Sequence, residues 1–295
     1  KERFGADNLY YLSTHKNHFN RTLKDYNIQL KSLKTNMSYF GFRFWHLLIS
    51  KKKILKKNSI EKFDLVIDLQ SKIRNTLILR QFPAKYFYSP TFNFKFCSLK
   101  KDFQSTKNEI NNVIFNLEKL LDTKIPFRKY TLKKIDKKYF IESKKLLPNE
   151  NYIGFSITQG NEYRKKSWSL KSFINIAKKI ENKGKIPVFF IEKKNFKLIN
   201  MIKQEIDNAL FPELETIFSG PPLVSALSTR LEKVISIDNG IMHMVGLANI
   251  PMIVLFGPTS SKKFSPKIDN LKILDSKIIY NSNNILKITE EDVLD

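Results

Sequence analysis

The sequence predicts an α/β protein with two domains, each built on a parallel sheet covered by helices. Short apolar runs alternate with helical patterns along almost the whole chain, which is typical of parallel strands buried on both faces. The 295 residues exceed what one ordinary α/β core needs, and an apolar fraction of 42% supplies side chains for two. We expect the two domains to face each other across a cleft.

The first domain is expected to span residues 1–147. Its strand patterns lie at 9–13, 27–33, 64–69 and 85–89, and its helical patterns include 71–82 and 102–121. The chain opens at Lys1 with a pattern that indicates the end of a helix, so we expect the first strand and most of the first helix of this domain to lie upstream. A polar, Lys-rich region containing Pro126 and Pro148 places the boundary near residue 148.

The second domain is expected to span residues 148–280, with a terminal helix at 281–295. Strands are expected at 152–157, 187–192, 215–220, 233–238 and 252–257, and helices at 169–184, 195–206, 221–231 and 240–250. Both domains therefore read as Rossmann-like. Ligands bind beyond the carboxyl ends of the strands in open parallel sheets, so the strand-to-helix junctions are where we expect a site.

The charge is strongly basic and uneven. The net charge is +24, and residues 1–147 hold 32 Lys/Arg against 12 Asp/Glu, whereas residues 148–295 hold 20 against 16. This distribution indicates an anionic partner for the first half, and no zinc-ligand spacing or RNA-binding signature favours nucleic acid. The one cysteine excludes an internal disulfide and fits a cytoplasmic protein. The chain shows no signal-peptide pattern and no apolar run near the roughly 20 residues that span a bilayer.

The junction at residues 234–246 is the first candidate site. A strand ends on Asp238, and a helix is expected to open at Gly240, where unpaired backbone N–H groups suit a phosphate. His243 falls in the first turn and is placed to donate to a phosphate oxygen. Asp238 is expected to fix the loop or one tautomer of His243. The alternative is that Asp238 and Asn239 simply cap a core helix.

Three further junctions carry polar candidates. Lys166 follows the strand at 152–157 and is placed to neutralise a leaving diphosphate, and Trp168 is expected to wall the site or anchor the next helix. Glu192 ends the strand at 187–192, where a carboxylate suits ribose hydroxyls. Thr259 lies in a tight turn and suits a phosphate or sugar. The alternatives are a solvated basic turn, an exposed loop acid and a plain turn.

In this order, these segments resemble the lipopolysaccharide heptosyltransferase family, whose members have the two-domain GT-B fold. The similar segments are the Lys-x-Trp loop, the Asp-x-Gly-x-x-His motif, the Phe-Gly-Pro-Thr turn, an Asp-Leu-Val-Ile-Asp-Leu-Gln segment and the chain end, here at 166–168, 238–243, 256–259, 64–70 and 288–295. Asn239 departs from the family by replacing a hydroxyl residue, so one phosphate hydrogen bond would come from an amide. Ser71 departs by replacing a glycine.

The resemblance implies roles residue by residue. Lys166, Asp238 and His243 are the implied catalytic residues, and the family's general base, an Asp in a Gly-rich turn after the first strand, is expected upstream of Lys1. The implied donor-binding residues are Thr158, Lys166, Asp238, Asn239, Gly240 and His243, to which our reading of the junctions adds Glu192 and Thr259. Gln70 and Arg74 are implied to face the acceptor.

The implied reaction is inverting transfer of a heptose or a related sugar from an ADP-sugar to a lipopolysaccharide core or another lipid-linked anionic acceptor, with no cofactor and no metal. The enzyme would then work at the inner face of the cytoplasmic membrane. Phe40, Phe44, Leu47 and Leu48 share one predicted helical face ahead of Lys51–Lys53, as an interfacial anchor or as a core-packing helix. Two alternatives remain: another GT-B enzyme, such as a different sugar transferase or a sugar-nucleotide epimerase, and a non-catalytic GT-B homologue that binds a ligand.

Overall fold

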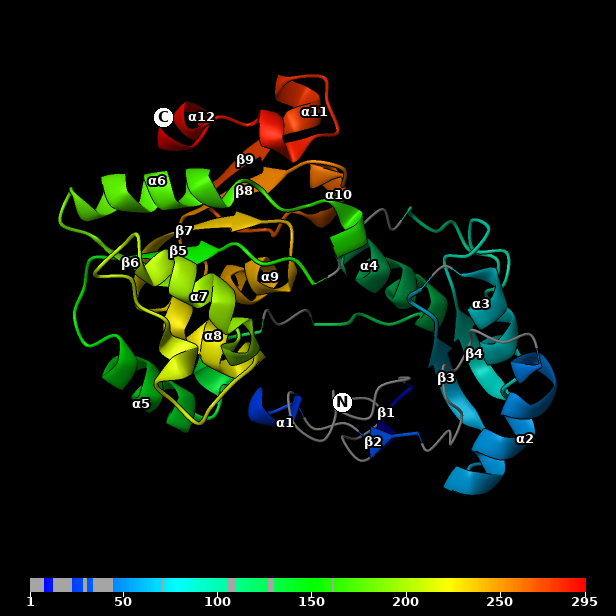
Figure 1. Ribbon diagram of the computed structural model, residues 1–295. Helices are drawn as coiled ribbons and strands as arrows, with labels where there is room; N and C mark the ends of the chain where they lie inside the picture. The colour runs from blue at the N-terminus through cyan, green and yellow to red at the C-terminus, as the bar shows by residue number, and fades with distance from the viewer. Residues whose placement is uncertain are drawn as a thin grey trace. The chain divides into compact units, whose positions relative to one another are not determined.

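The structure is a computed structural model, and the chain divides into two compact units (Figure 1). The first unit comprises Lys1–Lys24 and Ile28–Lys129, and the second comprises Asp25–Asn27 and Tyr130–Asp295. The residues described are 8–12, 23–28, 31–33, 45–70, 72–105, 110–126, 130–160 and 162–295.

The second unit contains one five-stranded sheet in which every neighbouring pair of strands is parallel. The strand order is β6-β5-β7-β8-β9. The strands are β5 (Tyr152–Ser156), β6 (Ile186–Phe189), β7 (Leu231–Ile237), β8 (Met252–Phe256) and β9 (Leu271–Asp275). The strands predicted at 152–157, 187–192, 233–238 and 252–257 are confirmed. Their carboxyl ends meet at one edge of the sheet, as parallel pairing requires.

The strand predicted at 215–220 is wrong, and the sequence reading missed β9. Leu210, not this segment, pairs with the edge of β6, through a single bridge to Val188. Residues 215–220 follow a 3₁₀ turn at Pro212–Leu214, and Ile217 is 93% exposed. The central side chain of this apolar run faces solvent, so the run does not pack against the sheet. β9 pairs with β8 instead and closes the other edge.

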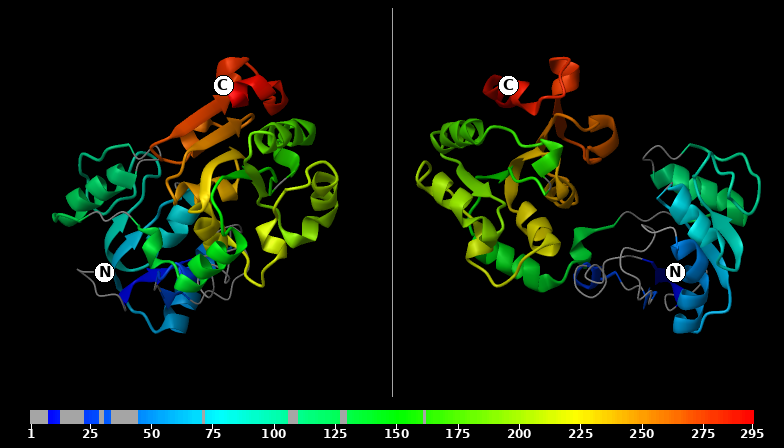
Figure 2. Two further views of the ribbon diagram at one scale, coloured as in Figure 1. Left: turned by 90° about the vertical axis from the view of Figure 1, so that its left-hand side faces the viewer. Right: turned by 45° about the vertical axis from the view of Figure 1, so that its right-hand side comes forward.

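Helices cover both faces of this sheet (Figures 1 and 2). Along β5, Ile153 and Phe155 join a core cluster with α6 (Leu170–Glu181) and α12 (Glu290–Leu294). Tyr152 and Gly154 point the other way, where α8 (Pro221–Ser228) packs against α9 (Gly240–Gly246). The strand side chains alternate, yet both sets are buried, which explains why the strands read as continuous apolar runs.

The remaining helices of the second unit are short: α7 (Phe196–Lys203), α10 (Ser261–Phe264) and α11 (Ser276–Ile279). Two helix ends in this unit differ from the prediction. The helix predicted at 240–250 ends at Gly246 as α9. The terminal helix predicted at 281–295 is confined to α12, because a 3₁₀ turn at Ile285–Lys287 precedes it and a capping box between Thr289 and Asp292 fixes its start.

The division between the units differs from the boundary we placed near residue 148. Helix α5 (Lys137–Leu146) packs against α8 and so belongs to the second unit. Residues 25–27 join it there: the Tyr26 hydroxyl lies 2.8 Å from Ser225 Oγ, and the Tyr139 hydroxyl donates to Asp25 at 2.8 Å. These contacts join residues more than 100 positions apart in the chain, which a composition shift cannot reveal.

The first unit is also α/β, with two parallel strand pairs, β1-β2 and β3-β4. Leu33, Ile54, Ile78 and Phe82 form its buried core cluster. Its elements are β1 (Tyr10–Tyr11), α1 (Leu23–Asp25), which straddles the division, β2 (Lys31–Ser32), α2 (His46–Asn58), β3 (Phe63–Ile67), α3 (Ile73–Arg80), β4 (Ala84–Tyr88) and α4 (Ile110–Leu121). The helix predicted at 102–121 is shorter, because residues 102–105 are not helical.

Helix α2 does not present the single apolar face that we predicted for residues 36–57. Phe40 and Phe44 lie outside the described residues. Leu47 packs against the core cluster of the first unit, whereas Leu48 is 85% exposed. The buried face of α2 is instead His46, Ser50 and Ile54. Within the described ranges, no helix is long and apolar enough to cross a membrane.

The close packing around β5 gives a stability prediction. A Cβ on Gly154 would approach a methyl of Leu231 to 2.7 Å and a methyl of Val234 to 2.8 Å. Gly154→Ala should lower the free energy of unfolding by about 1–3 kcal/mol, because overpacking forces neighbours off their rotamers. Urea denaturation of the purified protein measures this change. Gly160→Ala is the matched control, since its Cβ would meet nothing within 4 Å; equal urea midpoints for the two variants would contradict the prediction.

Candidate functional site

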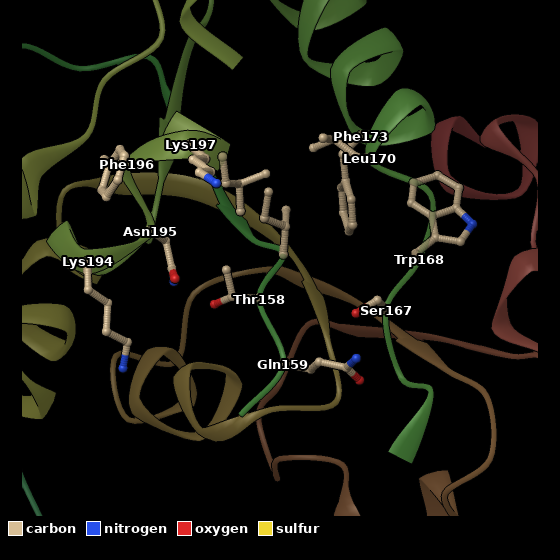
Figure 3. Close-up of a pocket in the computed structure, with 12 residues that line it drawn as sticks. Thr158, Gln159, Ser167, Trp168, Leu170, Phe173, Lys194, Asn195, Phe196 and Lys197 are labelled. Carbon is tan, nitrogen blue, oxygen red and sulfur yellow. The ribbon is translucent and has the colours of Figure 1, made fainter. Parts of the chain in front are cut away.

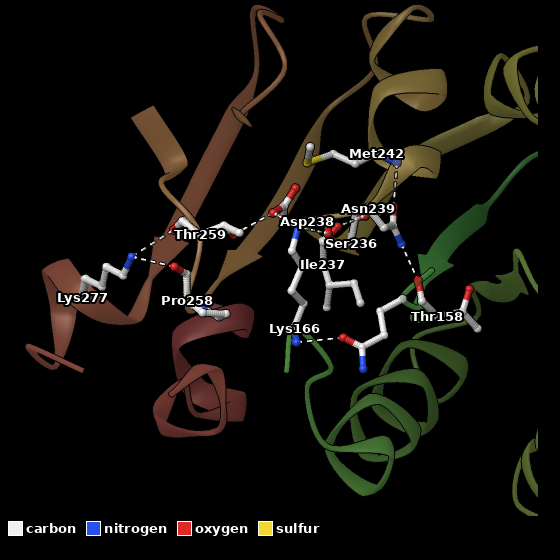
Figure 4. A network of polar contacts seen from close by, with 11 residues as sticks. Thr158, Lys166, Ser236, Ile237, Asp238, Asn239, Met242, Pro258, Thr259 and Lys277 are labelled. Atoms are coloured by element: carbon white, nitrogen blue, oxygen red, sulfur yellow. Dashed lines mark hydrogen bonds and ion pairs between the residues drawn. The ribbon is translucent and has the colours of Figure 1, made fainter. Parts of the chain in front are cut away.

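A buried ion pair lies where β5 and β7 end. The Lys166 ammonium contacts the Asp238 carboxylate at 2.5 Å, and it lies 3.4 Å from the Asp238 carbonyl oxygen (Figure 4). The two side chains are 12% and 7% exposed. The Gln159 side chain accepts from the Lys166 backbone N–H at 2.8 Å and fixes the loop that carries the lysine. Two of the predicted catalytic residues, 72 positions apart in the chain, are therefore in direct contact.

The turn after β8 supports this pair. The Thr259 hydroxyl donates to the same Asp238 oxygen at 2.6 Å. Lys277, on α11, donates to the Pro258 carbonyl at 2.9 Å and so holds the turn in place. Thr259 was predicted to bind a phosphate or sugar; its hydroxyl proton is directed at Asp238 instead. Asp238 thus has two side-chain donors and acts as the internal counter-ion of Lys166.

Asn239 caps α9 and also reaches across to β5. Its side-chain oxygen accepts from the Met242 N–H at 3.0 Å, which is the capping contact. Its amide nitrogen donates to Ser156 Oγ at 2.7 Å and to the Thr158 carbonyl at 2.9 Å. Our expectation that this amide supplies a phosphate hydrogen bond meets a different geometry here, because both of its N–H groups already have protein acceptors.

Gly240 and His243 lie beside the ion pair on the first turn of α9. Gly240 is exposed, so its backbone is accessible to a ligand. His243 is exposed in part, yet desolvation by the groups around it lowers the pKa of its imidazole below the usual value; the Asp238 carboxylate raises that pKa and the Lys166 ammonium lowers it further. A neutral imidazole at neutral pH keeps one N–H donor and one acceptor nitrogen.

A cavity of about 710 Å³ opens next to this network, at the carboxyl ends of β5 and β6 (Figure 3). Trp168, Leu170 and Phe173 form an apolar wall on one side, and Lys194–Lys197 lie on the other, with Thr158 and Gln159 between them. Trp168 serves both roles considered for it. It lines the cavity, and its indole N–H donates to the Ile288 carbonyl at 2.9 Å, anchoring the start of α6 to the chain end.

Other predicted residues are not among those that line this cavity. Glu192 is not among its lining residues; its carboxylate is 61% exposed and pairs with Lys194. Gln70 and Arg74 belong to the first unit, beyond the end of β3. The Gln70 backbone N–H donates to Asp68, a buried carboxylate that also accepts from the Thr76 and Ser89 hydroxyls. The acceptor-binding role of Gln70 and Arg74 stays a prediction.

The structure adds residues that the sequence reading did not select. Gln159 and Lys277 hold the two loops of the ion pair, and Lys194, Asn195 and Phe196 line the cavity. The Lys-Lys-Asn-Phe-Lys run that follows β6 was a usable signal, because it is a polar junction in the same position as the others. Lys277 gave no signal, since it lies on a four-residue helix that the pattern did not predict.

The arrangement suits a ligand with an apolar, planar part and an anionic part. The cavity offers aromatic walls beside polar groups, which is typical of sites for small molecules. Next to it, the Lys166 ammonium has three N–H donors, and both of its described hydrogen bonds are to one residue, Asp238. An ammonium held in a mostly buried position stabilises developing negative charge more strongly than an exposed one.

Comparison with known proteins identifies a matching family. The family model described as glycosyltransferase family 9 (heptosyltransferase) matches residues 51–292. A search of curated proteins finds no match.

Solved structures share the GT-B fold of this chain. A glycosyl transferase family 9 structure from Veillonella parvula is 17% identical, with a TM-score of 0.68, over 97% of this chain and 86% of that one. E. coli heptosyltransferase WaaC with ADP is 13% identical, with a TM-score of 0.62, over 92% and 84%. A UDP-GlcNAc 2-epimerase from Methanocaldococcus jannaschii is 12% identical, with a TM-score of 0.52, over 97% and 82%.

The environment of His243 gives a titration prediction. Its pKa, measured by NMR of the imidazole protons, should lie below the usual 6.5, because burial disfavours the charged ring. Lys166→Met should raise that pKa by removing a like charge, and Asp238→Asn should lower it further. A folded-state pKa below the unfolded value means that the folded protein loses stability as the pH falls from about 6.5 through the folded pKa.

His243→Gln serves as the control for this measurement. It identifies the His243 resonances, and it should remove that part of the pH dependence of unfolding. A His243 midpoint at or above 6.5, or shifts of the same sign in Lys166→Met and Asp238→Asn, would contradict the arrangement.

Proposed function

Because the chain belongs to glycosyltransferase family 9 and is a glycosyltransferase, we propose that it transfers a heptose from ADP-heptose to a lipid-linked anionic sugar acceptor. The observation that carries this proposal is the mostly buried Lys166 beside an aromatic-walled cavity at the carboxyl ends of the strands. The WaaC structure that shares this fold is described as holding ADP, which supports an adenine nucleotide over others.

We place the nucleoside of the donor in the cavity and its diphosphate at Lys166. The adenine ring suits the apolar wall of Trp168 and Phe173, since aromatic side chains offer planar faces and edges to a base. Thr158 lines the cavity and lies next to the ion-pair network, so the two parts of the donor fit one continuous site. Gly240 and His243 complete the diphosphate end.

The proposed reaction inverts the anomeric centre. A hydroxyl oxygen of the acceptor attacks the anomeric carbon, the bond from that carbon to the diphosphate oxygen breaks, and ADP leaves with the bonding electrons. A carboxylate general base takes the hydroxyl proton. Lys166 and the N–H of His243 offset the charge that grows on the leaving diphosphate, a role that a divalent metal fills in other enzymes. Hence we propose a metal-independent reaction with no cofactor.

Transfer assays test this function directly. The protein should release ADP from ADP-heptose and add a heptose mass to a lipid-linked phosphorylated oligosaccharide, with the rate unchanged by EDTA. Lys166→Ala should reduce kcat by about 100-fold or more, the effect typical of losing one preorganised donor to a developing charge. Mass spectrometry of the acceptor and a coupled ADP assay measure the two products.

Lys165→Ala is the matched control, because Lys165 is the exposed neighbour and has no described part in the ion pair. It should leave the rate near that of the unchanged protein. Turnover of UDP-sugars in place of ADP-heptose would overturn the donor assignment, and epimerised nucleotide sugar without transfer would favour an epimerase.

The acceptor is proposed to be reached at an anionic membrane surface, through the outer face of α2. Trp45 and Leu48 are 55% and 85% exposed on this face, and Lys52 and Lys56 continue it along the helix. All five lysines of α2 are exposed, and the helix contains no acidic residue. Exposed lysines next to an aromatic and an aliphatic side chain suit anionic lipid head groups.

Vesicle binding tests this surface. Co-sedimentation with vesicles that contain anionic lipid should be strong at low salt and weaker in about 0.5 M sodium chloride, because salt screens exposed charges. Lys52→Glu/Lys56→Glu should reduce binding several-fold. The charge-matched control is Lys144→Glu/Lys145→Glu on α5, two exposed lysines outside this face. Equal loss in both double variants would show a response to net charge alone and would contradict the surface.

A further inference from the structure

Asn239 is the residue at which the two parts of the donor site meet. Its side chain makes three hydrogen bonds to three different segments: the last residue of β5, the loop that follows β5, and the first turn of α9. Figure 4 shows it between Met242 on one side and Thr158 on the other. The amide has two N–H groups and both are used, so its capacity to donate is complete.

Two of these partners, Ser156 and Thr158, lie at and just after the end of β5. Ser156 is fully buried, and the Thr158 carbonyl belongs to a residue that lines the cavity. The contacts of Asn239 with Ser156 and Thr158 join positions 83 and 81 residues apart, so Asn239 fixes the end of β5 against the turn that carries Asp238 and Gly240. A hydroxyl side chain at this position keeps the helix cap, but it has one proton and a shorter reach, so it cannot also serve the acceptors on Ser156 and Thr158.

We infer that Asn239 is a positioning residue that holds the nucleoside end and the diphosphate end of the donor site in register. This inference rests on the donor site proposed above. Thr158 belongs to the cavity, and Asp238 pairs with Lys166 at the diphosphate end; one amide side chain joins the two. The donor spans both ends, so a shift between them costs affinity even when neither end loses a contact of its own.

The role is indirect, and this separates it from a phosphate contact. The side chain has no N–H left for a ligand, so its removal acts on binding through the loop geometry. A cap residue alone would affect α9 and the stability of the fold. The hydrogen bonds to Ser156 and Thr158 would affect the affinity for a ligand that bridges both loops. The two effects are separable by substitution.

Calorimetry with ADP tests the inference. Asn239→Ser keeps a cap for Met242 and loses the hydrogen bonds to Ser156 and Thr158. It should raise the Kd for ADP about tenfold, because ligand binding must then also bring the two loops into register. Asn239→Ala should raise the Kd equally and should also unfold at a lower urea concentration, because it loses the cap. Ser156→Ala, which leaves Asn239 in place, should give a smaller increase.

The double variant Asn239→Ser/Ser156→Ala should bind ADP no more weakly than Asn239→Ser, since the two residues form one contact. Asn175→Ala is the matched control: this amide on α6 donates to Glu290 at 2.8 Å, outside the cavity lining. It should lower the urea midpoint without changing the Kd.

The outcomes are distinct. If the unchanged protein does not bind ADP, the proposed donor site fails. If it binds ADP and Asn239→Ser matches it within about twofold at a temperature where both are folded, the positioning role fails while the donor site stands. An equal loss of affinity in Asn175→Ala would reduce the effect to general loosening of the unit and would also overturn the inference. If Asn239→Ser does not fold, Ser156→Ala decides the question from the other side of the contact.

Discussion

The parallel pairing of β5, β7, β8 and β9 is the constraint on which the site depends. Parallel strands must all end at the same edge, so the residues that follow them are brought together whatever their separation in the chain. Lys166 follows β5, Asp238 follows β7, Thr259 follows β8 and Lys277 follows β9. Each supplies one member of a single polar network.

The same constraint decides how much of the protein could be predicted from sequence. Strand-to-helix junctions are visible as an apolar run followed by polar residues, so Lys166, Asp238 and Thr259 were found at three of them. β9 was missed because its run, Leu-Lys-Ile-Leu-Asp, is short and interrupted by a lysine, and Lys277 was missed with it. The segment 215–220 misled for the opposite reason: its composition suits a strand, but Leu210 already pairs with the edge it would have occupied.

Pairing partners were harder to predict than positions. The sequence placed Thr259 and Asn239 near a ligand, and position alone suggested that their polar atoms face it. The structure gives both side chains protein partners, at Asp238 and at β5 respectively. Such partners lie 21 to 83 residues away along the chain, and only the fold brings them within hydrogen-bond distance. The division between residues 129 and 130 could not be predicted for the same reason. Helix α5 belongs to the second unit because it packs against α8.

The polar groups of the site fall into two kinds, and the difference follows from their hydrogen-bond capacity. The Asn239 amide donates to Ser156 at the end of β5 and to Thr158 in the loop after it, so this side chain is fixed and can act on a ligand only through the backbone that it holds. Lys166 is mostly buried beside a carboxylate, and both described hydrogen bonds of its ammonium are to Asp238, which Thr259 also supports.

In the donor site that we propose, a diphosphate shares or replaces that carboxylate without leaving Asp238 unpartnered, because the Thr259 hydroxyl remains. Asp238 therefore holds the Lys166 ammonium in a poorly solvated position before the ligand binds. When the anionic ligand pairs with Lys166, Asp238 keeps the Thr259 hydroxyl as its donor. This property requires three strands to end together, and it explains why Lys166, Asp238 and Thr259 act as one unit.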